Sequence, residues 1–310
     1  MNDDGTSFGR LESPRLTMAD CVIQRQGSAG VWSCANYAID LSTPKIMAII
    51  NVTENSFSGD GFAGKREQIR ARAERLIADG ADILDVGGES TRPGVQPVSL
   101  QEELDRIVPV VESLADLGFP ISVDTMKPEV MKEAIKAGAA IINDVRALEA
   151  PGAIEVVSQS TVGVCLMHMK GEPRTMQQAP RYDDVVQDVA EYLLRRADAL
   201  HSVGVSRNRV CIDPGFGFGK TLEHNIALFQ SLEKFLTLDC PLLIGVSRKS
   251  MLGEITGKPV SQRTTASAIA AVLAISQGAS IVRVHDVAET RDALSVWQVL
   301  RGESEARQLC

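Results

Sequence analysis

The 310-residue sequence lacks an excess of positive charge, a long hydrophobic run and a recognisable export signal. Its formal net charge of −8 at pH 7 argues against a general nucleic-acid-binding protein. No apolar run reaches the roughly 20 residues that a membrane-spanning helix needs, so we expect no membrane partner. The first residues, Met1-Asn-Asp-Asp-Gly5, are acidic and no apolar core follows them, so we also expect no secretory signal.

Paired cysteines are absent as well. The six cysteines are scattered, and no two of them form a C-x-x-C pair. Cys165 and Cys211 lie inside apolar segments, where a free thiol behaves as a small hydrophobic group. This usage is typical of a reduced protein, and we expect a cytoplasmic one.

The two common glycine-rich nucleotide-binding patterns are missing. Residues 210–220 end in a glycine-rich loop and a lysine, but a P-loop needs a glycine where Pro214 stands. The first expected strand-to-helix turn carries no G-x-G-x-x-G fingerprint. We therefore interpret residues 210–220 as a buried strand that ends in Asp213, followed by a flexible loop that offers the ring of Phe218. The simpler alternative is a strand-end turn that only buries a phenylalanine.

What the sequence does contain is a repeated alternation of strand and helix patterns. Eight short apolar segments, each followed by polar residues, predict buried strands at residues 46–50, 81–86, 121–123, 141–142, 162–167, 210–212, 242–246 and 281–284. Helical periodicity lies between them, with Ser99 and Glu102 as an expected capping box and Pro128 in an expected first turn. Eight such units predict an α/β fold, a (β/α)8 TIM barrel; an open doubly wound sheet is the alternative.

The expected barrel domain covers residues 21–302. Residues 1–20 are polar, and we expect a mobile N-terminal tail there, with a short C-terminal tail at residues 303–310. Residues 21–41 hold two short alternating pieces around residues 27–30, which predict a small hairpin or an edge cover.

Polar side chains at the ends of the predicted strands form the candidate site, because barrel active sites lie at the carboxyl ends of the strands. Each one alone could merely cap a turn or pair with a neighbour, but together they converge on one rim. The candidates are Asn51, Asp85, Asp124, Asn143, Met167, His168, Asp213, Lys249, Arg283 and His285.

The chemistry of these residues indicates a class of ligand. Carboxylates and amides around Asp213 can pair with a flat, nitrogen-rich ring. Arg283 and His285 leave the last strand, near where barrels commonly bind phosphate. Asn51 offers a hard oxygen suited to Mg²⁺ that is held mostly by water and phosphate, and the glycine-rich residues 87–94 could close as a lid. The residues alone therefore predict an enzyme that acts on a small phosphorylated heterocycle.

At these positions the sequence resembles the dihydropteroate synthase family, the folate-pathway enzymes that sulfonamides inhibit. The motifs occur in order along residues 46 to about 300, and the wider pterin-binding group, which includes methyltetrahydrofolate methyltransferases, shares part of them. The matching stretches are Asn51-Val-Thr53, Ser56-Phe-Ser58, Asp85-Val-Gly-Gly-Glu-Ser-Thr-Arg-Pro-Gly94, Ser122-Val-Asp-Thr125, Ile142-Asn-Asp144, Cys165-Leu-Met-His-Met169, Asp213-Pro-Gly-Phe-Gly-Phe-Gly-Lys220, Ser247-Arg-Lys-Ser250 and Arg283-Val-His-Asp286.

The resemblance implies a transferase that joins 6-hydroxymethyl-7,8-dihydropterin diphosphate to p-aminobenzoate and releases pyrophosphate. The family mechanism is dissociative: pyrophosphate leaves first, and the arylamine then attacks a pterin-methyl cation. The resemblance further implies Mg²⁺ as cofactor and a homodimer that forms through the late helices, where the alanine-rich residues 265–274 favour close packing.

The same resemblance implies a role for each rim residue. Asp124, Asn143, Asp213 and Lys249 would hold the pterin, with Met167 and Phe218 against it. Asn51, Arg283 and His285 would contact the diphosphate, and Asn51 would also touch Mg²⁺. Among these residues Asp124, Lys249, Arg283 and His285 would be catalytic. The p-aminobenzoate site would be lined by Thr91, Arg92, Pro93, Phe218, Lys249 and Ser250.

The first loop departs from the family pattern, which usually reads Thr-Pro-Asp-Ser-Phe-Ser-Asp-Gly-Gly. Here Glu54 and Asn55 follow Thr53, and the later Asp-Gly is inverted to Gly59-Asp60. We expect Asp60 to order the loop by pairing with Arg92; a solvated turn residue is the alternative. A methyltransferase of the pterin-binding group and a non-catalytic paralogue that binds pterin stay open as alternative functions.

Overall fold

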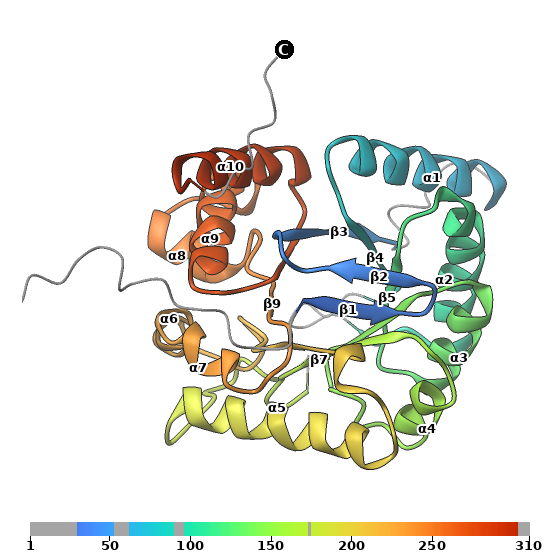
Figure 1. The fold of residues 1–310 in the computed structure, drawn as a ribbon, viewed down its shortest axis with the longest axis horizontal. Helices are drawn as coiled ribbons and strands as arrows, with labels where there is room; N and C mark the ends of the chain where they lie inside the picture. Colours follow the sequence, from blue (N-terminus) through green and yellow to red (C-terminus); the bar gives the residue numbers. More distant parts are fainter. Residues whose placement is uncertain (1–29, 53–61, 90–95, 173–174, 303–310) are drawn as a thin grey trace, which may run out of the picture.

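The computed structural model describes residues 30–52, 62–89, 96–172 and 175–302 (Figure 1). The expected tails at residues 1–20 and 303–310 lie outside these described residues. So do the expected p-aminobenzoate residues Thr91, Arg92 and Pro93, and Asp60 of the first loop.

Eight parallel strands form the centre of the molecule, and they confirm the predicted TIM barrel. They are β3 (Lys45–Asn51), β4 (Ile83–Gly87), β5 (Ile121–Asp124), β6 (Ile141–Asp144), β7 (Gly163–Met167), β8 (Val210–Asp213), β9 (Leu243–Ile244) and β10 (Ile281–Val284). The sheet order is β8-β7-β6-β5-β4-β3-β10-β9, and a parallel bridge between Ile212 and Leu242 brings β9 to β8. The alternative of an open doubly wound sheet is therefore wrong.

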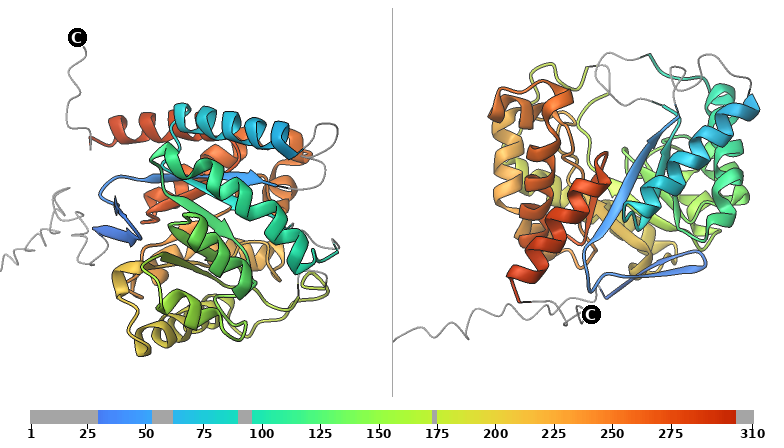
Figure 2. Two further views of the ribbon diagram at one scale, coloured as in Figure 1. Left: turned by 90° about the vertical axis from the view of Figure 1, so that its right-hand side faces the viewer. Right: turned by 90° about the horizontal axis from the view of Figure 1, so that it is seen from above.

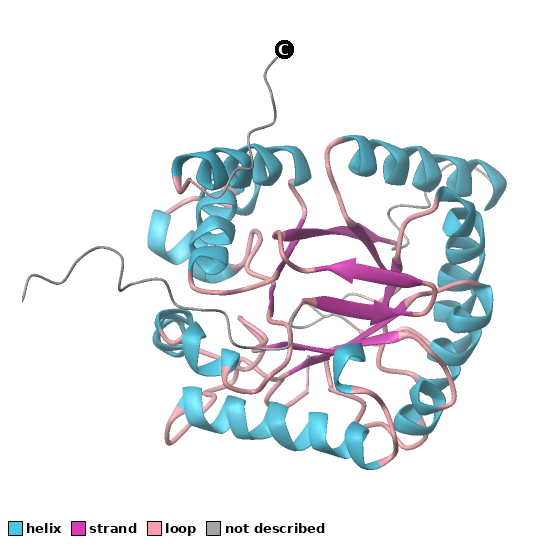
Figure 3. Ribbon diagram, in the orientation of Figure 1, coloured by secondary structure: helices cyan, strands magenta, loops and turns pink. Residues whose placement is uncertain are grey.

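Helices surround this sheet as an outer ring (Figures 1 and 3). They are α1 (Phe62–Ala78), α2 (Leu100–Leu114), α3 (Pro128–Ala137), α4 (Ala153–Ser158), α5 (Val185–Ser202), α6 (Leu222–Gln230), α7 (Leu232–Leu236), α8 (Ser250–Thr256), α9 (Thr264–Ser276) and α10 (Val287–Leu300). Short 3-10 turns occur at η3 (Ala115–Leu117), η4 (Arg207–Arg209) and η5 (Val260–Gln262). Within the described part of the chain, no helix combines the length and the apolar character that crossing a bilayer requires.

Local signals explain where two of the helices begin. Pro128 is the first residue of α3, as predicted, because its fixed φ suits the first helical turn. The Ser99 hydroxyl accepts from the Glu102 N–H at 3.3 Å, which caps α2. The Glu102 carboxylate instead pairs with Arg106, so the described contacts contain only half of the expected capping box.

A hairpin closes the amino-terminal end of the barrel. Its strands β1 (Val31–Cys34) and β2 (Tyr37–Asp40) pair antiparallel, and both follow Gly30. The expected hairpin is confirmed, but both of its strands lie after residues 27–30, and the chain reverses at Ala35 and Asn36, with a φ of +51° at Ala35. The hairpin lies across the end of the barrel (Figure 2), and its Trp32 and Cys34 are fully buried. They pack with the first inward-facing residues of the barrel strands, which are Met47, Ile83, Ile141, Cys165, Cys211, Leu243 and Ile281.

The period-two alternation of the strands positions the functional rim. On β4, β6, β8 and β10 the inward side chain two residues after the apolar bottom layer is polar. These four side chains are Asp85, Asn143, Asp213 and Arg283, and the first three are buried. The interior of the barrel is therefore apolar at the amino-terminal end of the strands and polar at their carboxyl ends.

Candidate active site at the carboxyl ends of the strands

Arg283 lies at the centre of the polar cluster. Its Nε donates to Asp85 Oδ2 at 2.5 Å, and its Nη2 donates to Asp124 Oδ2 at 2.7 Å. Asn143 Nδ2 approaches the same Asp85 oxygen at 3.4 Å. Side chains from β4, β5, β6 and β10 thus form one hydrogen-bonded network across the top of the barrel.

Burial sets the charge state of this network. Desolvation, opposed by Arg283 and reinforced by Asp85, raises the pKa of Asp124 to about 7. Burial also works against the Arg283 charge, but Asp85 and Asp124 outweigh it and raise the pKa of Arg283 above its usual value. The site therefore holds a permanent cation beside a carboxylate that can titrate near neutral pH.

Asp213 and Lys249 form the second half of the rim. Asp213 Oδ1 accepts from the Gly215 N–H at 2.7 Å, which orients the carboxylate at the root of the glycine-rich loop. Lys249 Nζ donates to the Phe216 carbonyl and lies 4.6 Å from the centre of the Phe218 ring. Burial lowers the pKa of Lys249 to about 8, against the opposing effect of Asp213. Burial likewise raises the pKa of Asp213.

The motifs after β9 and β10 contact each other. Ser247 Oγ accepts from the His285 backbone N–H at 3.2 Å and lies 3.0 Å from His285 Nδ1. The hydroxyl can then donate to Nδ1, which leaves the proton of a neutral ring on Nε2. Arg248, with φ of +59°, forms a two-pronged ion pair with Asp286. These contacts hold the loop that carries Lys249 against the strand that carries Arg283.

The remaining predicted residues lie on the same rim. Asn51 ends β3 with an exposed side chain, and Met167 ends β7 with only 4% of its surface exposed. Ser250 is the exposed first residue of α8. Within the described ranges no group of three or more His, Cys, Asp or Glu side chains could bind a metal. The donor set at Asn51 therefore fits only an ion such as Mg²⁺ that takes most of its ligands from water and phosphate.

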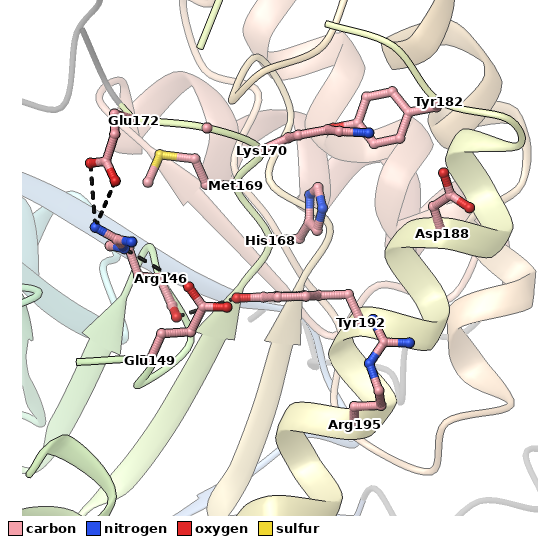
Figure 4. Close-up of a pocket in the computed structure, with 11 residues that line it drawn as sticks. Arg146, Glu149, His168, Met169, Lys170, Glu172, Tyr182, Asp188, Tyr192 and Arg195 are labelled. Carbon is pink, nitrogen blue, oxygen red and sulfur yellow. Dashed lines mark hydrogen bonds and ion pairs between the residues drawn. The ribbon is translucent and has the colours of Figure 1, made fainter. Parts of the chain in front are cut away.

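His168 does not join the rim, which corrects its place in the candidate set. Its ring lies 5.0 Å from that of Tyr192 and 6.1 Å from that of Tyr182, and its Nδ1 faces Lys220 at 2.9 Å. With Lys170 and other residues of the β6 and β7 loops it lines a separate cavity of about 380 Å³ (Figure 4). The residue after a strand has no fixed side, and here the chain turns it outward.

Two buried groups show what sequence reasoning missed. Asp85 was a candidate without a role, yet it bonds a residue 198 positions away. The other oxygen of Asp85 and the Ser122 hydroxyl are buried and have no hydrogen-bond partner among the described residues. Lys220 is the second group: the sequence marked it only as the end of the glycine-rich loop, although its side chain is buried, with 2% of the residue exposed. Alternation from Ile83 marks Asp85 as inward-facing, but no local signal identifies its partner.

The chain is similar to known proteins over most of its length. Residues 47–285 match the family model described as pterin binding enzyme. The chain is 46% identical over 272 residues to dihydropteroate synthase of Escherichia coli K12, which covers 87% of this chain and 96% of that protein.

Two solved structures are similar over most of the chain. A Yersinia pestis dihydropteroate synthase with a sulfonamide drug complex superposes with a TM-score of 0.83 at 44% identity, covering 88% of this chain and 99% of that one. A Burkholderia cenocepacia dihydropteroate synthase complexed with 7,8-dihydropteroate gives a TM-score of 0.80 at 47% identity, covering 88% and 97%.

Proposed function

We propose a division of roles at the rim from the premise that this chain belongs to the pterin-binding enzyme family and, within it, to the dihydropteroate synthases. Its reaction is a transfer in folate synthesis. It joins 6-hydroxymethyl-7,8-dihydropterin diphosphate to p-aminobenzoate and gives 7,8-dihydropteroate and pyrophosphate. The observation that carries the assignment of roles is the inward polar layer of Asp85, Asn143, Asp213 and Arg283 above an apolar barrel floor.

The pterin ring is assigned to the buried polar layer. Asp213 accepts only one described backbone bond, from the Gly215 N–H, so its other oxygen can accept from ring N–H groups. Asn143, on β6 and two strands away in the sheet, supplies both a donor and an acceptor. Asp124 and Lys249 complete the polar edge, and Met167 and Phe218 offer apolar surface to the ring faces. The 7,8-dihydropteroate bound to the Burkholderia relative supports a pterin site in this fold.

The diphosphate is assigned to the β10 side of the rim. The described bonds of Arg283 use Nε and Nη2, so its Nη1 group retains donors for a phosphate oxygen. His285, with a proton on Nε2, can donate to a second oxygen. Asn51 is the protein oxygen that would hold Mg²⁺, and the bound ion would neutralise charge on the leaving diphosphate. Arg283 and His285 stabilise the same developing charge from the protein side.

Departure of pyrophosphate leaves positive charge on the pterin methyl group, and nearby carboxylates can stabilise that charge. Asp124, ionised beside Arg283, offsets that charge. Asp85 holds Arg283 from below and keeps the guanidinium fixed while the charge on the substrate changes. The rim therefore pairs a fixed cation for the leaving group with a carboxylate for the cationic fragment.

The p-aminobenzoate is assigned to the outer side of the loop. Lys249 and Phe218 are in contact there, and Ser250 follows on the exposed start of α8. The ammonium of Lys249 can pair with the carboxylate of an arylamine acid. Thr91, Arg92 and Pro93 are assigned to the same substrate, with Asp60 as the partner of Arg92; all four lie outside the described residues.

The proposed assembly is a homodimer through α9 and α10. The two helices lie side by side (Figure 1). They expose Ile269 and Leu273 on α9 and Val296 and Val299 on α10, each about half or more accessible. Apolar side chains gathered on two neighbouring helices favour an interface. We also propose a cytoplasmic location, which the four free buried cysteines among the described residues support.

Inhibition kinetics test this function. A sulfonamide should compete with p-aminobenzoate and not with the pterin diphosphate, because it resembles the arylamine acid alone. The sulfonamide complex of the Yersinia relative supports this expectation. The measurement is the initial rate at varied concentration of each substrate and several inhibitor concentrations. A purely noncompetitive pattern against p-aminobenzoate would contradict the proposed arylamine site.

A further inference from the structure

The glycine-rich loop between β8 and α6 has no regular backbone ladder. Gly215, Gly217 and Gly219 have φ values of +70°, +79° and +64°, so every second residue of the loop has a left-handed backbone conformation. A Cβ on Gly215 would collide with the backbone oxygen of His168, so the loop also lies close against the end of β7. Buried carbonyl groups in such a loop need partners from elsewhere.

Side chains supply those partners at every carbonyl from residue 215 to residue 219. The Lys220 ammonium donates to the Gly215 oxygen at 2.8 Å and to the Phe218 oxygen at 3.1 Å. Lys249 donates to the carbonyl of residue 216 and Gln177 to that of residue 217. The Tyr182 hydroxyl donates to the carbonyl of residue 219 at 2.9 Å. Lys220 alone holds two of the five.

Lys220 is buried, and all three donors of its ammonium have partners. The third donor faces His168, with Nδ1 at 2.9 Å and the backbone oxygen at 3.4 Å. No carboxylate lies within ion-pair distance of Lys220 Nζ among the described residues. Burial lowers the pKa of Lys220 well below its usual value, and the charge of Asp213 opposes that effect. Keeping a lysine in such a place is costly, so its hydrogen bonds to the loop must offset the cost.

His168 is a fixed acceptor for that lysine. Because Nδ1 accepts, the proton of the neutral ring lies on Nε2. Burial and the nearby Lys220 charge lower the pKa of His168 well below its usual value, so the ring stays neutral. Its ring meets the Tyr192 ring edge-on, with an interplanar angle of 87° (Figure 4). Tyr182, on the other side, bonds the same loop.

We propose that Lys220 and His168 are positioning residues that set the place of Phe218 and thereby the affinity for the arylamine substrate. This inference rests on the proposed function. Lys220 lies behind the loop and bonds its backbone, so it acts through the loop. Phe218 stands on the loop and lies under Lys249, whereas Asp213 is the last residue of β8 and takes one bond from the loop, from the Gly215 N–H. Loss of the hydrogen bonds from Lys220 should therefore weaken the binding of p-aminobenzoate more than the binding of the pterin diphosphate.

Three single variants test the proposal. Lys220→Met keeps the length of the side chain and removes the donors, and His168→Phe keeps the ring and removes the acceptor. Lys234→Met on the exposed face of α7 is the matched control. Steady-state kinetics should show the KM for p-aminobenzoate raised about tenfold or more in the first two variants, as expected for a misplaced contact residue. The KM for the pterin diphosphate should change by less than about threefold, and the control should match wild type.

The two residues should also behave as one unit. The double variant Lys220→Met/His168→Phe should be no worse than the poorer single variant. A merely structural role would lower thermal stability and the active fraction but leave both KM values as in wild type, and that result overturns the proposal. Should Lys220→Met fail to fold, His168→Phe decides alone: an unchanged KM for p-aminobenzoate overturns it.

A second readout separates this inference from the proposed function. If the wild-type protein makes no 7,8-dihydropteroate, the proposed function fails, and amide deuterium exchange of residues 215–219 then decides the loop inference. Faster exchange in both variants than in the Lys234→Met control supports the positioning role of Lys220 and His168. Exchange equal to that of the control overturns it.

Discussion

Single carboxylates at the rim carry different tasks because their partners differ. Asp85 is fully buried and holds Arg283 through Nε, whereas Asp213 is bonded by one backbone N–H and faces the space above the floor. Asp85 binds Arg283 through one oxygen, and its other oxygen is buried without a partner among the described residues, whereas Asp213 retains acceptor capacity for a ligand. This contrast assigns Asp213 to substrate recognition and Asp85 to the support of Arg283.

Asp213→Asn tests the recognition role. The amide oxygen can still accept from the Gly215 N–H, so the loop should keep its shape. The NH₂ group would replace an acceptor that faces ring N–H groups, and pterin binding should weaken by roughly 1–3 kcal/mol. Isothermal titration calorimetry with the pterin measures this, and circular dichroism checks the fold. Unchanged affinity in a folded variant would remove Asp213 from the pterin site.

The pH dependence of kcat/KM for the pterin diphosphate tests the two titrating groups. Asp124 must be ionised to offset charge, and its raised pKa means that it becomes protonated as the pH falls through about 7. Lys249 must be protonated to donate, and its lowered pKa means that it loses its charge as the pH rises through about 8. We therefore expect a narrow, bell-shaped dependence of kcat/KM on pH, with its maximum between these two pKa values.

Lys249→Arg provides the control for this profile, because arginine stays protonated and should remove the alkaline limb even where the rate is lower. A flat wild-type profile between about pH 6 and 9 would show that neither group titrates as described.

The local pattern of apolar residues shows where the strands end, and the rim residues could be predicted from the sequence only through those strand ends. Asn143 and Asp213 follow apolar segments and face inward, as alternation requires. His168 follows β7 in the same way but turns outward, because the residue after a strand is no longer bound by the pleat. The ion pair of Asp85 with Arg283 depends on the register of the closed sheet, which no local pattern contains.

At the scale of elements, a hairpin closes the amino-terminal end of the barrel, and the sequence predicted its position only roughly. The apolar segments predicted seven of the eight strands at nearly their observed bounds. The hairpin lies after residues 27–30, and its turn at Ala35 and Asn36 has the positive φ on an alanine, which the sequence pattern does not mark. β9 is two residues long where five were expected, so closure rests partly on the bridge from Ile212 to Leu242.

Trp32→Ala tests the hairpin as a structural plug. Trp32 is fully buried, and its Nε1–H donates to the Arg209 carbonyl at 2.9 Å. Its truncation should lower the free energy of unfolding by about 3–5 kcal/mol, measured by denaturant titration. The kinetic constants should stay near wild type, because the plug lies at the end of the barrel opposite the rim. Val31→Ala, on the exposed side of the same strand, is the control and should change little.

At the scale of the whole molecule, the exposed apolar side chains of α9 and α10 predict a dimer. Leu273→Glu places a charge in the proposed interface and should shift sedimentation from dimer to monomer. Val203→Glu, equally exposed after α5, is the matched control and should leave the assembly unchanged. A wild-type protein that sediments as a monomer at micromolar concentration would contradict the dimer and leave the rim assignment intact.

The central claim is that one barrel rim joins a pterin diphosphate to an arylamine. Its most direct test is product formation by the purified protein with Mg²⁺ and both substrates, against each substrate alone. We predict that 7,8-dihydropteroate and pyrophosphate appear in equal amounts only when both substrates are present, and that Arg283→Ala lowers the rate by on the order of 10²-fold. Failure of the folded wild-type protein to form 7,8-dihydropteroate under these conditions would contradict the account.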